Sequence, residues 1–168
     1  MLSQNLSLTI KEKMKWFIVP LVMLLQIICT PNQCLSQEKR ITTETQSIYE
    51  LRKKAEYLNL QNCDRICECL VNYVDESHWN DILVIIYKES RGDSLSYNGQ
   101  DYGLMQVNNF HIKHGTAIKD SLFYMDYNVK YGYEIYLEFS KMDYENRFAG
   151  YNGSQSYQQD AIKILESL

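Results

Sequence analysis

The segment that most constrains the fold carries apolar side chains at the spacing of a helix with one buried face. These residues are Trp79, Ile82, Leu83 and Ile86. Residues 75–77, Asp-Glu-Ser, precede them and are typical of a helix start, because their side-chain oxygens can accept hydrogen bonds from the first amide groups. We therefore predict a largely buried helix that begins near residue 79.

The rest of the sequence favours further helices over strands. The 168 residues include only 7 glycines and 2 prolines, too few for a turn-rich β fold. Apolar spacing predicts further helices at residues 43–60, 66–74, 128–139, 144–151 and 157–167. The first of these is otherwise charged, so we expect it to lie on the surface or to act as a linker. Residues 94–109 are rich in Gly, Asn and Asp and predict a loop with a small hairpin. The predicted fold class is mostly α with a minor β part.

The N-terminal segment has the pattern of an export signal. Three lysines within residues 11–15 precede the thirteen-residue apolar run Trp16–Ile28. This run is short for a membrane-spanning helix, which needs roughly 20 apolar residues. Cys34-Leu35-Ser36 then matches the small-x-small pattern of a cleavage site. We expect a mature protein outside the cytoplasm, in the periplasm or another extracytoplasmic space, and an uncleaved anchor is the alternative.

This segment defines the expected organisation of the chain. We predict a signal peptide at residues 1–36, a helical extension at 37–62 and the main domain at 63–168. Contact with a membrane is then expected only through the N-terminal segment.

Charge and cysteine content weigh against several classes of function. The chain has 17 Lys and Arg against 21 Asp and Glu, so it lacks the basic excess that nucleic-acid binding requires. Export would place Cys63, Cys67 and Cys69 in an oxidising space, where three thiols form at most one internal bridge. Their spacing lacks the paired C-x2-C pattern of zinc sites. We predict neither a metal site nor a cofactor.

Glu89 stands out because it lies on the apolar face of the predicted buried helix. It follows Ile86 by three residues and Ile82 by seven, which places the three side chains on one face. Partial burial raises the pKa of a carboxyl group, and a general acid near neutral pH needs such a raised pKa. A surface glutamate at a frayed helix end is the alternative from position alone.

Four short motifs occur in an order that resembles one enzyme family. They are Glu89-Ser90, the string D-Y-G-L-M-Q-V-N from Asp101 to Asn108, Asn128-x3-Gly132, and A-G-Y-N at residues 149–152. Together they resemble the signatures of lytic transglycosylases, bacterial and phage enzymes with a goose-lysozyme-like fold that cut peptidoglycan. The string, extended to His111, is most similar to the specialised subgroup that accompanies secretion and conjugation machines. The resemblance covers about residues 66–155.

The resemblance implies a role for each motif. Glu89 would be the catalytic acid, and the hairpin region would form one side of a glycan groove. The implied substrate-binding residues are Ser90, Gly103, Met105, Gln106, Tyr151 and Asn152. The Tyr151 hydroxyl would face Glu89. Asn128 would start a helix, and Gly132 would allow a close contact between two helices. The implied partners are peptidoglycan glycan strands and a secretion or conjugation complex.

The resemblance also implies a reaction that uses one carboxyl group. Glu89 would protonate the glycosidic oxygen beside the muramic residue, and its carboxylate would then draw a proton from the C6 hydroxyl, which closes a 1,6-anhydro ring. A hydrolase would need a second carboxylate. Asp101 is the candidate, because its string also resembles c-type lysozymes. A muramidase is therefore the alternative enzyme, and a non-catalytic wall-binding or secretion-scaffold protein is a third interpretation.

Overall fold

The computed structural model describes residues 45–168, except for the side chain of Met142. Residues 48–168 form one compact unit. The predicted signal peptide at residues 1–36 and the start of the predicted extension lie outside the described residues, so they stay predictions.

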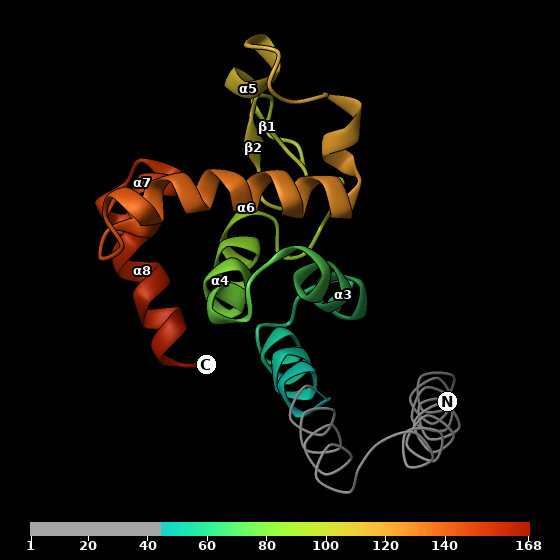
Figure 1. Cartoon of the computed structure of the whole chain (residues 1–168), viewed down its shortest axis with the longest axis vertical. Helices are drawn as coiled ribbons and strands as arrows, with labels where there is room; N and C mark the ends of the chain where they lie inside the picture. The colour runs from blue at the N-terminus through green and yellow to red at the C-terminus, as the bar shows by residue number, and fades with distance from the viewer. Residues whose placement is uncertain (1–44) are drawn as a thin grey trace, which may run out of the picture. The chain divides into compact units, whose positions relative to one another are not determined.

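The described part of the chain is mostly helical, with one two-stranded antiparallel sheet (Figure 1). Residues 45–57 form a first helix. The labelled elements are α3 (Cys63–Tyr73), the 3-10 turn η1 (Glu76–His78), α4 (Trp79–Glu89), β1 (Asp101–Tyr102), β2 (Val107–Asn108), α5 (Asn109–Lys113), the 3-10 turn η2 (Asp120–Phe123), α6 (Met125–Met142), α7 (Arg147–Asn152) and α8 (Gln155–Glu166). The strands pair with Asp101 opposite Asn108 and Tyr102 opposite Val107. The predicted fold class and the small hairpin are confirmed.

Helix α4 is the buried centre of the larger of two hydrophobic cores. Its residues Asp81–Ile86 are all buried, and Ile82, Leu83 and Ile86 have no exposed surface, as the apolar spacing predicts. The second core lies under the hairpin around Tyr102, Val107 and Leu122. Helix α6 packs against α3, η2, β2 and α7, and in Figure 1 it runs between the hairpin and the helices α3 and α4. The fold thus has a helical lobe and a hairpin lobe that meet along α6.

The helix at residues 45–57 differs from the expectation of a surface-lying element or linker. Leu51 and Ala55 are 2% and 0% exposed, and the following Leu58 and Leu60 are also buried in the larger core. The charged residues of this helix lie on its outer side, where Arg52 pairs with Glu56. The charge content therefore concealed a narrow apolar stripe that anchors the helix to the domain.

The cysteines of α3 are free thiols, two of them in the core. Cys67 and Cys69 are buried, and burial raises the pKa of each to about 12. A thiol with so high a pKa is protonated and unreactive near neutral pH. None of the helices in residues 45–168 combines the length and apolar character that crossing a bilayer requires.

Candidate active site

Glu89, the last residue of α4, lies in a hollow of about 190 Å³ between the helical lobe and the hairpin lobe. The other lining residues are Asp101, Gln106, Val107, Asn108, His111, Ile135, Tyr151 and Asn152. The hollow therefore brings together the predicted acid with four further residues that the motifs single out. These residues come from α4, the hairpin and α7, so only the tertiary fold assembles them.

The Glu89 carboxyl group is half-buried and has no cation paired with it among the described residues. Burial raises its pKa, and the nearby charge of Asp101 acts in the same direction. The Tyr157 hydroxyl and the Asn152 amide partly oppose this rise, and the Asn152 Nδ2 donates to Glu89 Oε1 at 3.3 Å. A carboxyl group with a raised pKa keeps its proton to a higher pH than an ordinary glutamate and can release it to a bound oxygen.

Tyr157 is the residue that sequence reasoning missed. Its hydroxyl is buried, has no partner in hydrogen-bonding geometry, and has its pKa raised by burial and by the charge of Glu89. The predicted residue, Tyr151, instead donates its hydroxyl hydrogen to the Met105 carbonyl oxygen at 2.8 Å. Tyr151 lines the hollow and ties α7 to the hairpin lobe, and its hydroxyl feels the charge of Glu89, so its predicted place beside the acid stays a prediction. Five residues separate the two tyrosines in the sequence, and only the turn between α7 and α8 brings the second one to Glu89.

Ser90 joins the end of α4 to the hairpin lobe through its hydroxyl group. Its Oγ donates to the Leu104 carbonyl oxygen at 2.7 Å and accepts from the Gly92 amide at 3.2 Å. The loop after Glu89 is thereby fixed. This structural role is the one that the contacts of Ser90 show, and its predicted substrate contact stays a prediction.

The glycine and methionine of the hairpin motif also serve packing. A Cβ on Gly103, whose φ is +75°, would stand 2.1 Å from the Leu122 carbonyl oxygen and 2.4 Å from Asn128 Nδ2. The protein interior therefore requires a glycine at position 103, and its predicted approach to the sugar stays a prediction. Met105 is 0% exposed, and a Cβ on Gly132 would stand 2.7 Å from its sulfur. Gly132 therefore accommodates Met105 and not a second helix, and Met105 does not line the hollow.

Asn128 is a buried cross-link and not a helix start. It lies one turn inside α6, and its side chain accepts from the Met105 amide at 2.7 Å and donates to the Tyr102 and Leu122 carbonyl oxygens at 2.9 and 2.8 Å. One amide side chain thus satisfies three backbone groups of the hairpin lobe. This network sets the position of the hairpin relative to α6.

Gln106 presents one side of its amide to the hollow. Its backbone is left-handed, with φ +49°, and its Nε2 donates to the carbonyl oxygens of Ser96 and Gly103 at 3.0 and 2.8 Å. Its Oε1 accepts no hydrogen bond from the described residues, so it is available to a donor in the hollow. His111 lies nearby, and burial lowers the pKa of its ring, which favours the neutral form.

Asp101 faces the same hollow from β1. Its carboxylate accepts from the side-chain amides of Asn98 at 2.7 Å and Asn108 at 2.5 Å. These two donors fix the position of the side chain. Asp101 therefore places a second carboxyl group in the hollow with Glu89.

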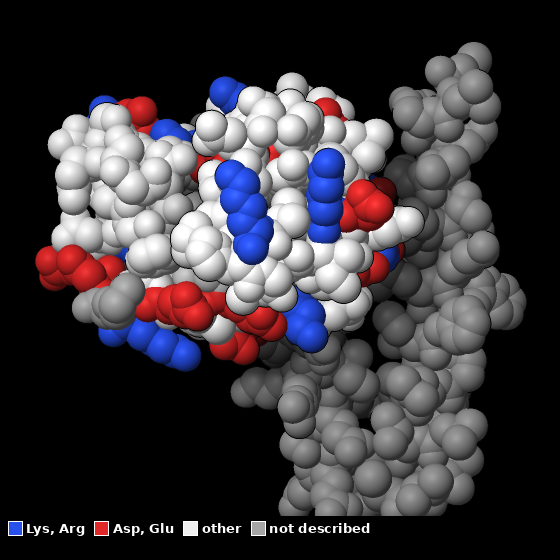
Figure 2. All heavy atoms as spheres, turned by 90° about the horizontal axis from the view of Figure 1, so that it is seen from above, with Lys and Arg blue, Asp and Glu red and all other residues white. Residues whose placement is uncertain are grey.

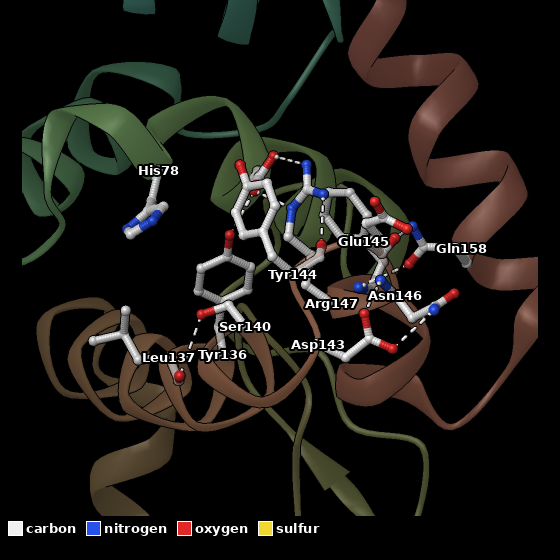
Figure 3. Close-up of polar contacts among 12 residues, drawn as sticks. His78, Tyr136, Leu137, Ser140, Asp143, Tyr144, Glu145, Asn146, Arg147 and Gln158 are labelled. Carbon is white, nitrogen blue, oxygen red and sulfur yellow. Dashed lines mark hydrogen bonds and ion pairs between the residues drawn. The ribbon is translucent and has the colours of Figure 1, made fainter.

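Helix α7, which carries Tyr151 and Asn152, is held at its start by a buried ion pair. Arg147 donates from Nε and Nη2 to the two oxygens of Asp81 on α4, and Tyr136 of α6 donates to the same carboxylate (Figure 3). Asp81, Arg147 and Tyr136 are 4%, 6% and 0% exposed.

Gln158 of α8 anchors the same helix from the other side. Its Oε1 accepts from the amides of Phe148 and Ala149 at 2.9 Å each, and its Nε2 donates to the Glu145 carbonyl oxygen at 2.7 Å (Figure 3). Asp81 and Gln158 together fix the position of α7 relative to α4.

The face above the hairpin and α5 is mainly uncharged. Figure 2 shows single Lys or Arg side chains on it and acidic side chains along one edge. This face therefore offers no continuous basic stripe for a polyanion.

Comparison with known proteins gives one match. Residues 72–165, more than half of the chain, match the family model described as the transglycosylase SLT domain. The matched stretch includes Glu89, the hairpin and helices α6 and α7. Neither the curated proteins nor the solved structures contain a significant match.

Proposed function

The chain belongs to the transglycosylase SLT domain family, and from this premise we propose that it cleaves the glycan strands of peptidoglycan with Glu89 as the general acid. The observation that carries the proposal is the half-buried Glu89 carboxyl group, which lines an open hollow and has no paired cation among the described residues. A carboxylate kept only for stability would be paired or solvated.

We propose a lytic reaction in which Glu89 acts twice. It first donates its proton to the glycosidic oxygen of the β-1,4 bond between muramic acid and glucosamine, while the substrate's N-acetyl group assists. The resulting Glu89 carboxylate then takes the proton of the C6 hydroxyl, whose oxygen closes the 1,6-anhydro ring. The amide of Asn152 and the hydroxyl of Tyr157 are the groups placed to stabilise the carboxylate between these steps.

Two amide groups are the proposed substrate contacts. The free Oε1 of Gln106 can accept a hydrogen bond from an N–H or O–H of a sugar, and the exposed amide of Asn152 can donate or accept. A glycan of N-acetylated sugars offers both kinds of group.

A muramidase that hydrolyses the same bond is the second candidate. It is favoured by one observation, namely that Asp101 lines the same hollow and its charge raises the pKa of Glu89. Hydrolysis with two carboxyl groups needs such a pair across the scissile bond.

The mass of the released fragments decides between the two reactions. We expect wild-type digests of purified peptidoglycan to end in 1,6-anhydro-muramic residues, one water lighter than reducing ends. Asp101→Asn should keep this product and most of the rate if Asp101 is a rim residue. Reducing ends from the wild type, with loss of activity in Asp101→Asn, would assign the protein to the muramidases.

We also propose that the protein works outside the cytoplasm, where its substrate lies, and that it serves a secretion or conjugation machine. The first part is supported by the basic and apolar pattern of residues 11–28 and the second by the string that ends at His111. Amino-terminal sequencing of the exported protein should begin at or near Gln37. Full-length protein found only in the cytoplasm would contradict the export proposal.

A further inference from the structure

Lys88, the residue before Glu89, turns its side chain onto α8. Its Nζ lies 4.4 Å from the centre of the Tyr157 ring and 3.6 Å from Asp160 Oδ2. The side chain is only 15% exposed, which is uncommon for a lysine. Asp160 also lies 3.6 Å from Lys163, so one carboxylate is shared by two ammonium groups.

The Tyr157 side chain therefore lies between the Lys88 ammonium group and the Glu89 carboxyl group. Lys88 lies over its face, and its buried, unpartnered hydroxyl is next to Glu89. An ammonium group over an aromatic face is attracted by the ring quadrupole and holds the ring in place. The same positive charge withdraws electron density from the ring and makes the hydroxyl a stronger hydrogen-bond donor.

We infer that Lys88 is a positioning residue for the reaction, which holds the Tyr157 hydroxyl against Glu89 and supports the carboxylate that forms when Glu89 gives up its proton. The inference rests on the proposed role of Glu89 as the acid. Asp160 limits the effect, because its negative charge holds the ammonium group and partly cancels its field.

Glu89 is faced by groups from several elements. His111 of α5 lines the same hollow, and burial lowers the pKa of its ring, which favours the neutral form. Asp101 of β1 raises the pKa of Glu89, and Lys88, Asn152 of α7 and Tyr157 of α8 lower it. The pKa of the Tyr151 hydroxyl is raised well above its ordinary range, so this group is neutral. Lys88 is therefore the cation that acts on this carboxyl group in the described part of the chain.

The test compares the pH dependence of cleavage in matched variants. Activity requires the protonated acid, so it falls as the pH rises through the pKa of Glu89. Lys88→Met removes a charge that lowers this pKa, so the alkaline limb of the pH–rate profile should move to higher pH. The variant's kcat should also fall by about two- to fivefold, which corresponds to the loss of one cation–π contact. Asp160→Asn should move the limb in the opposite direction, and Lys88→Arg should restore the wild-type profile.

Lys163→Met is the matched control. Lys163 contacts the same Asp160 from α8 at the same 3.6 Å, but its side chain is 75% exposed and does not lie over Tyr157. Its profile should equal that of the wild type. A carboxyl ¹³C NMR titration of Glu89 in each variant gives the same comparison without turnover.

The outcomes separate the two proposals. An active Lys88→Met variant with an unmoved limb, or an equal shift in Lys163→Met, would overturn the positioning role and leave the proposed function intact. A wild-type protein that does not cleave peptidoglycan would refute the proposed function. In that case the NMR titration still tests the positioning role, and an unchanged Glu89 titration in Lys88→Met would refute it.

Discussion

Helix α4 carries one carboxyl group near each end, and the two differ in burial and in their hydrogen-bond partners. Asp81 is 4% exposed and accepts hydrogen bonds from the Arg147 guanidinium and the Tyr136 hydroxyl. Glu89, eight residues later, is half-buried and receives one amide donor at 3.3 Å, and a buried tyrosine hydroxyl beside it has no partner.

The difference separates a structural carboxylate from one whose setting suits the proposed chemistry. A buried charge that is fully paired is held in one protonation state, and removing its partner is costly. A carboxyl group that burial pushes towards neutrality, without an ion pair to hold its charge, can change its protonation state at little cost. For these two carboxyl groups, the presence of an ion pair is therefore a better guide to the proposed role than the degree of burial.

The largest expected effect is that of Glu89→Gln on turnover. The amide cannot donate a proton to the leaving oxygen, and general acid catalysis contributes roughly 10²–10⁴-fold. Clearing of purified cell walls by equal amounts of folded wild type and variant measures it. Clearing at the wild-type rate would refute the role of Glu89.

The same variant should not lose stability at neutral pH. Because the pKa of Glu89 is raised in the folded state, its contribution to stability is greatest below the unfolded pKa and is lost as the pH rises through the folded pKa. At pH 7 the charged form is therefore a cost that glutamine removes. Thermal unfolding at pH 4 and pH 7 should show the variant gaining on the wild type at the higher pH.

Breaking the Asp81 pair should give the reverse pattern. Arg147→Met leaves a buried carboxylate without its cation, for a loss of about 3–5 kcal/mol in unfolding free energy. Urea denaturation measures this loss, and Asp81→Asn combined with Arg147→Met should recover part of it. Equal stability of Arg147→Met and wild type would contradict the structural assignment of Asp81.

The two tyrosines repeat the contrast on a smaller scale. Tyr157→Phe removes a hydroxyl that has no partner in the resting protein, so stability should hold. Turnover should fall by about 2- to 10-fold, the value of the one hydrogen bond that this hydroxyl is proposed to donate to the Glu89 carboxylate during the reaction. Tyr151→Phe removes the hydrogen bond to the Met105 carbonyl oxygen and should cost about 1 kcal/mol of stability with a smaller effect on turnover. Turnover and unfolding free energy are measured in parallel for both variants. A loss of stability in Tyr157→Phe, or a larger loss of turnover in Tyr151→Phe, would contradict this assignment.

Local periodicity was sufficient for the helices and for the position of Glu89 at the end of α4. The spacing of Trp79, Ile82, Leu83 and Ile86 predicts the buried helix, because a side-chain period of 3.6 residues follows from backbone geometry alone. The place of Glu89 on that face follows from the same period. Motif order then identifies the family, which the match over residues 72–165 shows.

The partners of each side chain were decided only by the tertiary structure. The motif residues Gly103, Met105 and Gly132 are in close contact with other side chains or backbone inside the protein. Tyr157 lies outside the motifs, but the fold places it beside Glu89. The physical reason is that hydrogen bonds and burial depend on distances between residues far apart in the chain. Such distances are set by the packing of α4, α6, α7 and α8, and no local pattern encodes them.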